Sequence, residues 1–278
     1  NKAIFEQRGF INIASLIPEF RDTARWLELA RQRTEDSFLA QVTADGVQRE
    51  RSYGYHNGVL RDAIEIMQQL EAVGIAVSDA YRERIQKMYD YIFAVATPDL
   101  GAPMFGDGSR PLVETPDRSK WPLYDTLMEA THLLGDAKYA ARARWNRKDL
   151  PKQTSAAFSE AGMYVFRNDW GPEAIHMGLH CSPPAISGHD HPDNSTFELY
   201  AYGRWLMPDS GFYVYGHDPE ARAWHRQTRV HQTMTLDGAD SAVDGRHLLW
   251  HTDDDLDAVV VENPSYAGLT HRRSVWFV

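Results

Sequence analysis

Apolar residues recur every three or four positions along the first half of the chain. Residues 26–42, 60–70, 85–92 and 123–134 each show this spacing, and Gly135 follows the last of them. Such a period places one side of a helix in an apolar core. Long connections that contain Gly and Pro, such as residues 98–121, are more typical of a helical toroid or barrel than of a tight bundle.

After about residue 150 the pattern changes. Short segments alternate in polarity or are β-branched, with turn residues between them: residues 163–166, 175–179, 197–200, 233–236 and 258–261. A period of two predicts antiparallel strands. We therefore expect an α+β multidomain protein, with a helical portion at 1–150 and an antiparallel β-sheet domain at 151–278. The chain starts without Met and ends on the strand-like residues 274–278, so we expect a processed or partial chain whose sheet domain is truncated.

Composition narrows the class of protein. With 43% apolar and 24% charged residues among 278, the chain has the make-up of an ordinary globular protein, and no apolar run reaches the length of a membrane span. The net charge of -10 argues against a nucleic-acid partner. Cys181 is the single cysteine, which excludes an internal disulfide framework.

Most of the histidines lie in the β half, and His189-Asp190-His191 is their densest group. Two histidines one residue apart point to the same side if the backbone is extended. His191, Asp209 and His231 together offer two imidazoles and a carboxylate, a set that suits zinc with water in the fourth place. Alternatively, Asp209 is a turn residue before Gly211 and His231 a cross-strand partner. His189 could not readily share one small ion with His191 if the turn between them differs, so we expect it outside the ligand set.

A second candidate segment is the loop at residues 45–56. It presents Glu50, Tyr53, Tyr55 and His56 ahead of a helix that begins near Val59. A tyrosine in such a loop is usually a packing residue. A phenol beside histidines or a basic group can nevertheless have its pKa lowered and then transfer a proton.

Four separated stretches, in order, resemble one family. NKAIFEQ, DGVQRERSYGYH, HDHPDNSTFELYAYGRWLMPDSG and HQTMTLDG are similar to motifs of the heparinase II/III-like polysaccharide lyases, which include heparin/heparan-sulfate lyases and oligoalginate lyases. The resemblance runs across roughly residues 1 to 240. It implies an (α/α) toroid followed by an antiparallel β-sheet domain, and β-elimination on an acidic polysaccharide that contains uronate.

The resemblance also implies residue roles. Asn1 neutralises the uronate carboxylate, Tyr55 is the proton-transferring phenol, and His189 is a second acid/base or carboxylate-binding group. His191, Asp209 and His231 hold one divalent metal, zinc by preference, in a mainly structural role. Lys2 stands where some members carry a histidine base, so we expect Tyr55 to act with His189.

Substrate contacts are expected from the residues around these groups: Lys2, Glu50, His56, Tyr215, Arg222 and Arg226. Arg222 and Arg226 are four residues apart, so a short helix or loop can aim both at an anionic glycan, although ordinary surface charges have the same spacing. The 46–50 loop and Lys2 favour a heparan-sulfate-type glycan, with alginate or oligoalginate as the alternative. The resemblance further implies export from a bacterial cell, to the periplasm or as a secreted protein. A homodimer is one assembly that the sequence leaves open.

Two other classes of protein are open at this point. A hydrolase on the same helical half would use two carboxylates, for which Glu50, Asp107 and Asp125 are candidates. A binding module for acidic glycans would need only aromatic platforms such as Trp205, Tyr213, Tyr215 and Trp224.

Overall fold

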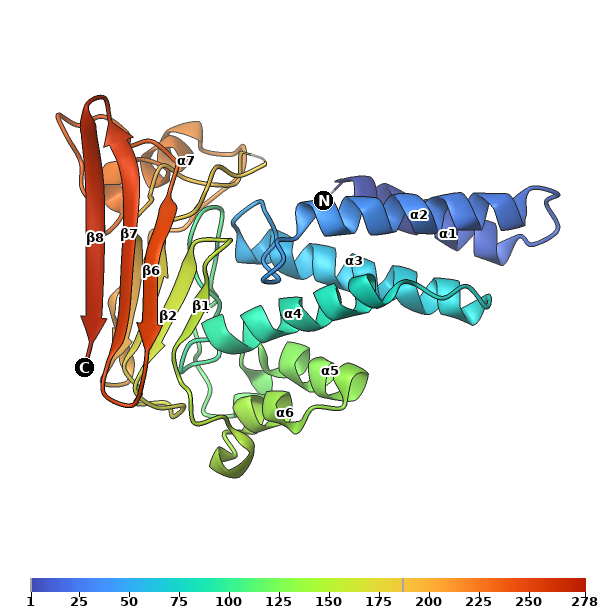
Figure 1. Ribbon diagram of the computed structural model, residues 1–278, viewed down its shortest axis with the longest axis horizontal. Helices are drawn as coiled ribbons and strands as arrows, with labels where there is room; N and C mark the ends of the chain where they lie inside the picture. Colours follow the sequence, from blue (N-terminus) through green and yellow to red (C-terminus); the bar gives the residue numbers. More distant parts are fainter. Residues whose placement is uncertain (1, 187) are drawn as a thin grey trace.

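A computed structural model describes residues 2–186 and 188–278 of the chain. Helices fill its first half: α1 (Lys2–Leu16), α2 (Thr23–Gln41), α3 (Tyr53–Ala72), α4 (Asp79–Val95), α5 (Tyr124–Leu134) and α6 (Ala137–Arg144). In Figure 1 they extend to one side of a layered β structure. The predicted change of character falls between the short 3-10 helix η2 (Arg147–Asp149) and β1 (Ala156–Phe158).

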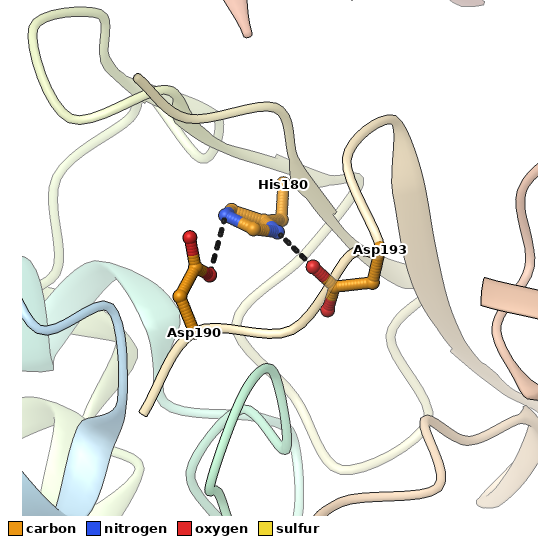
Figure 2. A group of neighbouring side chains, drawn as sticks. All are labelled: His180, Asp190 and Asp193. Atoms are coloured by element: carbon orange, nitrogen blue, oxygen red, sulfur yellow. Dashed lines mark ion pairs between the residues drawn. The ribbon is translucent and has the colours of Figure 1, made fainter. Parts of the chain in front are cut away.

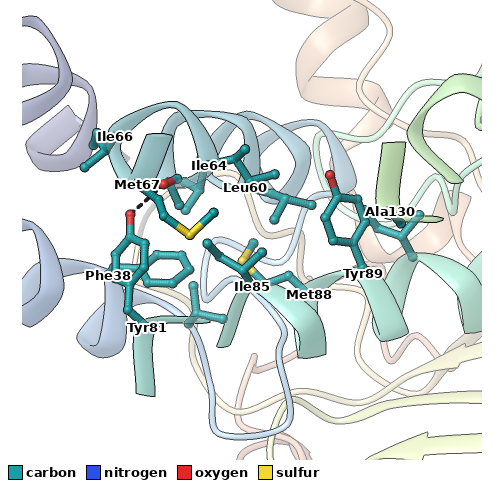
Figure 3. Close-up of a cluster of buried hydrophobic side chains, with 14 of the residues drawn as sticks. Phe38, Leu60, Ile64, Ile66, Met67, Tyr81, Ile85, Met88, Tyr89 and Ala130 are labelled. Atoms are coloured by element: carbon teal, nitrogen blue, oxygen red, sulfur yellow. Dashed lines mark hydrogen bonds between the residues drawn. The ribbon is translucent and has the colours of Figure 1, made fainter. Parts of the chain in front are cut away.

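The helices form because each buries its apolar stripe against the next. The predicted faces of α3 and α4 are both buried in one cluster, part of which Figure 3 shows: Leu60, Ile64, Met67, Leu70, Ile85, Met88, Tyr89 and Ile92. Ser78 accepts a hydrogen bond from the Tyr81 amide and so caps α4. Gly135 ends α5 with a left-handed backbone (φ 70°), which a glycine adopts without steric cost.

The second half holds two antiparallel sheets. The first has the order β1–β2–β3–β4–β5 and adds β2 (Met163–Arg167), β3 (His176–His180), β4 (Thr196–Ala201) and β5 (Arg204–Met207). The second has the order β6–β7–β8, formed by β6 (Arg246–Thr252), β7 (Asp257–Tyr266) and β8 (Leu269–Phe277). Figure 1 shows the second sheet as the outer layer, away from the helices.

Strand β2 explains how the layers are joined. Its residues alternate between two cores: Met163 and Val165 pack with Tyr91 of α4, whereas Tyr164 and Phe166 pack with residues of the second sheet. Because successive side chains of a strand point to opposite faces, one fully buried strand connects helices to sheet and sheet to sheet. This sandwiched position makes the junction of the helical and β halves a packed interface.

One predicted strand is wrong. Residues 233–236 form no strand, and only an isolated bridge joins Leu236 to Ala239. Asp237 and Gly238 both have positive φ and turn the chain there. The Thr233 hydroxyl donates to the Asn194 carbonyl, a side-chain bond that replaces a strand ladder at this position.

A segment between β5 and β6 returns to the junction. It contains α7 (Pro219–His225) and the 3-10 helix η3 (Thr228–Val230), and Asp218 caps α7 through the Ala221 amide. In Figure 1 α7 lies beside the upper end of the sheets. Within the part of the chain that the structure describes, no helix combines the length and apolar character needed to cross a membrane.

Candidate functional site

The candidate residues meet where loops of both halves come together. From the helical half come the loop before α3 and the long connection between α4 and α5. From the β half come the β3–β4 connection, which holds His189 and His191, and the segment from Asp209 to His231. Asn1, the predicted carboxylate-neutralising residue, lies outside the described residues, and Lys2 opens α1 with an exposed side chain.

We call Glu50, Tyr55, His189 and Tyr215 the outer group. The Tyr55 and His189 rings stack with centroids 3.7 Å apart and an interplanar angle of 15°. His189 Nδ1 lies 2.5 Å from Glu50 Oε2, and the His189 side chain keeps 26% exposure, against 4% for Glu50. The hydroxyls of Tyr55 and Tyr215 are 3.2 Å apart. The outer group therefore holds a phenol and an imidazole together, with access to solvent.

Tyr55 and His56 lie in the first turn of α3 rather than in the loop before it, because the helix begins at Tyr53. This placement separates their side chains. Tyr55 reaches His189, whereas His56 points into the core, where it is 1% exposed. His56 Nδ1 accepts from the Gln48 amide at 3.3 Å, and Nε2 donates to the Met88 carbonyl at 3.2 Å.

The prediction that His56 contacts substrate does not fit this burial. Both ring nitrogens are used by backbone groups, so His56 joins the loop before α3 to helix α4. Burial lowers the pKa of His56 to about 4, although the bond to Met88 opposes the shift. The imidazole is neutral at physiological pH and acts as a structural support.

We call His191, Asp193, Asp209 and His231 the inner cluster. His231 Nδ1 donates to Asp209 Oδ2 at 2.8 Å, and the rings of His191 and His231 are 5.6 Å apart. Ligand atoms of Asp193, Asp209 and His231 all lie within 4.8 Å of one another. The structure therefore groups two of the predicted ligands, Asp209 and His231, with Asp193, which was not predicted as a ligand, and places the His191 ring beside that of His231.

Unpaired buried atoms of the inner cluster fit a cation. Among the described residues, no hydrogen bond reaches His191 Nδ1, His231 Nε2 or either carboxylate oxygen of Asp193. Burial alone would raise the pKa of Asp193, but His180, His231 and His191 outweigh it and lower that pKa well below its usual range. Imidazole nitrogens and carboxylates in this number suit a divalent metal such as zinc.

His180 lies between Asp190 and Asp193, next to the inner cluster. Its Nε2 lies 4.0 Å from Asp190 and its Nδ1 lies 3.3 Å from Asp193, on opposite sides of the ring, as Figure 2 shows. These three side chains also form a possible cation-binding trio. One imidazole cannot turn both nitrogens to a single ion, so the geometry favours an orienting role for His180 toward Asp193.

Asp107, from the long α4–α5 connection, joins the outer group to the inner cluster. Its fully buried carboxylate accepts from His191 Nε2 at 3.0 Å, from the Tyr215 hydroxyl at 2.8 Å and from Arg222 Nη2 at 2.8 Å. Arg226 Nη1 is 3.2 Å away. Burial would raise the pKa of Asp107, but the bonds from His191, Arg222 and Tyr215 prevail and lower it.

These contacts decide where the predicted arginines point. Arg222 lies on α7 and Arg226 is the C-terminal cap of that helix, so one short helix and its cap carry both side chains. Both guanidinium groups turn to Asp107, and Arg226 also donates to the Asp190 carbonyl at 2.9 Å. Two arginines share one carboxylate here, which leaves excess positive charge next to Tyr215.

Two site residues, Asp193 and Asp107, were not predicted as such, and the sequence carries a signal for only one of them. Asp193 stands two residues after His191 within a quoted motif, and that spacing was available as a ligand signal. Asp107 had none, because it lies in a long irregular connection far from every motif. Sequence reasoning named it only as a hydrolase carboxylate, a role its four donors do not favour.

Both halves of the chain match known protein families and relatives. A family model described as heparinase II/III N-terminus matches residues 1–118, and one described as heparinase II/III-like, C-terminal, matches residues 150–278. The chain is 33% identical over 285 residues to a heparin-sulfate lyase of Pedobacter heparinus and 33% identical over 289 residues to one of Bacteroides stercoris. Each alignment covers 100% of this chain and 42% of the relative.

Solved structures show the same likeness. The crystal structure of heparan sulfate lyase from Pedobacter heparinus matches with a TM-score of 0.86 and 31% identity, covering 99% of this chain and 43% of that one. A heparinase III crystal structure matches with a TM-score of 0.84 and 27% identity, covering 99% and 45%. The mixed helical and antiparallel fold is thus that of these lyase structures, and the chain spans less than half the length of the relatives it matches.

Proposed function

The chain belongs to the heparinase II/III-like family, and from that premise we propose that it carries the catalytic groups of a polysaccharide lyase. The substrate is a uronate-containing glycan of the heparan-sulfate type, cleaved by β-elimination. The observation that carries the proposal is Tyr55 stacked on His189, with His189 paired to Glu50. The names of the similar proteins support the choice of glycan.

The chemistry requires a proton to move at two positions of the sugar. The C5–H bond of the uronate breaks, its electron pair forms the C4–C5 double bond, and the C4–O4 bond breaks. Tyr55, as phenolate, takes the C5 proton, and the resulting phenol returns a proton to O4 of the leaving sugar. One group can serve both steps when C5–H and O4 lie on the same face of the ring.

His189 and Asn1 stabilise charge in this proposal. The imidazole of His189 lies parallel to the Tyr55 ring and is held by Glu50, so it is placed to bind the uronate carboxylate or to exchange a proton with the phenol. Negative charge grows on the carboxylate as the enediolate forms, and donors fixed in place lower that barrier. We assign Asn1 to the same task, with Lys2, Arg222 and Arg226 supplying positive charge for an anionic polymer.

We propose that the inner cluster holds one divalent metal, zinc by preference, through His191, Asp209 and His231 with Asp193. When bound, the metal supplies a fixed positive charge that cross-links the β3–β4 connection to the segment after β5. The unpaired buried nitrogens of His191 and His231 support this assignment. We also propose that the helical half is part of an (α/α) toroid and that the protein acts outside the cytoplasm, where such glycans occur.

The test is near-ultraviolet absorbance, which detects the C4–C5 double bond that only elimination makes. We expect absorbance to rise with heparan sulfate and to stay flat with alginate, for a zinc-loaded protein extended to the length of its relatives. A rise with alginate alone would change the substrate class. Shortened polymer without absorbance would indicate hydrolysis, and binding without shortening would indicate a glycan-binding module.

A further inference from the structure

Asp107 occupies a position that no motif explains. The carboxylate is fully buried at the junction of the two halves, and its donors come from two connections of the β half: His191 from the β3–β4 connection, and Tyr215, Arg222 and Arg226 from the segment between β5 and β6. One of these donors belongs to the inner cluster and another to the outer group. A single side chain thus contacts both.

The backbone around Asp107 is built to hold it there. The Asp107 amide donates to the His189 carbonyl at 2.8 Å, and the Ser52 hydroxyl donates to the Asp107 carbonyl at 2.9 Å. Gly106 has φ +60°, and a Cβ on it would stand 2.5 Å from the His189 carbonyl oxygen. On the other side, a Cβ on Gly211 would stand 2.5 Å from the Gly108 carbonyl oxygen. The loop is therefore wedged between the His189 backbone and the turn after Asp209.

Two branches lead away from the carboxylate. In the first, Asp107 accepts the Nε2 proton of His191, which leaves Nδ1 of that ring as the unpaired, ligand-capable nitrogen. In the second, Asp107 accepts from the Tyr215 hydroxyl, and this hydroxyl lies 3.2 Å from that of Tyr55. Arg222 and Arg226 donate hydrogen bonds to the same carboxylate and hold it in one orientation.

We propose that Asp107 is a positioning residue that sets the metal-binding tautomer of His191 and, through Tyr215, the place of the Tyr55 hydroxyl. It touches neither substrate nor the reacting atoms. The His191 branch concerns metal affinity alone, whereas the Tyr215 branch rests on the proposed function. The two branches can therefore fail separately.

The experiment compares wild type with Asp107→Asn, Tyr215→Phe and the double variant. Zinc affinity is measured by competition with a chromophoric chelator, and kcat and KM by product absorbance at saturating zinc. We expect Asp107→Asn to weaken zinc binding about 10- to 100-fold, as loss of an outer partner of a metal-binding histidine does, and to lower kcat at least about tenfold. Asp254→Asn, on an exposed loop, is the matched control and should leave both unchanged.

Tyr215→Phe separates positioning from general loss of structure. It keeps Asp107 intact, so we expect zinc affinity like wild type and a kcat lowered about tenfold, with KM within about threefold. The double variant should match Asp107→Asn in kcat within about threefold, because both changes break one chain of contacts. Losses that multiply would overturn the Tyr215 branch.

Zinc affinity decides the other branch, whatever the activity. The His191 branch is overturned if Asp107→Asn binds zinc as tightly as the wild type does, or if the wild type binds no zinc. A wild type that binds zinc but cuts no uronate polymer would overturn the proposed function and the Tyr215 branch, and would leave the His191 branch to the affinity measurement. If Asp107→Asn fails to fold by circular dichroism, the kcat of Tyr215→Phe decides the Tyr215 branch. The His191 branch is then decided in the wild type by nitrogen-15 NMR of the His191 ring, where a proton on Nδ1 instead of Nε2 would overturn it.

Discussion

His189 and His191 are separated by one residue, yet they belong to different environments. His189 stacks on Tyr55, pairs with Glu50 and keeps part of its side chain in solvent. His191 is fully buried and pairs with Asp107. Each histidine takes a carboxylate from a different loop of the helical half, so the outer group and the inner cluster are both completed across the junction.

The difference between these two regions follows from backbone shape. Residues 189–195 form an irregular connection rather than a strand, so alternation does not send both rings to one face. A group that exchanges protons with a polymer needs access to it, whereas a metal-binding set gains from exclusion of water. We expect changes in the outer group to affect turnover, and changes in the inner cluster to affect stability.

Tyr55→Phe should have the largest effect. It removes the proposed proton-transfer group while the aromatic ring can keep its place on His189. We expect kcat, measured by product absorbance, to fall by about 10²- to 10⁴-fold. The unfolding midpoint and the zinc content should equal those of the wild type in thermal unfolding and metal analysis.

Tyr202→Phe is the control, since Tyr202 is 76% exposed on the turn between β4 and β5. Near-full turnover by Tyr55→Phe would remove this tyrosine from the proton transfer. A large loss of stability would erase the contrast between the two regions.

Metal removal should act on the inner cluster in the opposite way. A ligand present at 100 to 1,000 times its dissociation constant stabilises the folded state by about 3–4 kcal/mol. We therefore expect chelation to lower the free energy of unfolding by about this amount, and zinc to restore it, in denaturant titrations. Folded protein should keep its kcat within about threefold, and a collapse of kcat without loss of stability would place the metal in the reaction.

The buried His56 sharpens the comparison through pH. Its folded pKa of about 4 lies below the ordinary value of 6.5, so the unfolded chain binds more protons between these values. Stability from the neutral ring is complete above about pH 6.5 and is lost as pH falls toward 4. The stability difference between wild type and His56→Asn should therefore shrink by up to about 3 kcal/mol over that range.

Denaturant titrations at several pH values test this effect. His217→Asn makes the same substitution at an exposed histidine and is the control. A constant difference between wild type and His56→Asn would mean that His56 is reachable by protons in the folded state, in which case its predicted substrate contact would need to be considered again.

The order of the elements followed from the chain alone. Helical and strand periods predicted α2 to α5 and the strands β2, β3, β4, β7 and β8, because an apolar stripe of period 3.6 or 2 must be buried whatever lies opposite. The helices α1 and α6 and the strands β1, β5 and β6 were not predicted. The stretches around Tyr55 and His189 identified the family, because local spacing carries those motifs. The segment at 233–236 shows the limit of this reasoning, since its Asp237-Gly238 turn and the bond of Thr233 override strand propensity.

Tertiary structure alone decided which residues complete the site. Asp107 has no local pattern and reaches His191, Tyr215 and Arg222 across 84 to 115 residues of chain. His56 stands one residue from Tyr55 but faces the core, since adjacent residues of a helix point in directions about 100° apart. Sequence spacing thus determined the elements and motifs, whereas burial and pairing at the junction depended on loops whose paths no periodicity encodes.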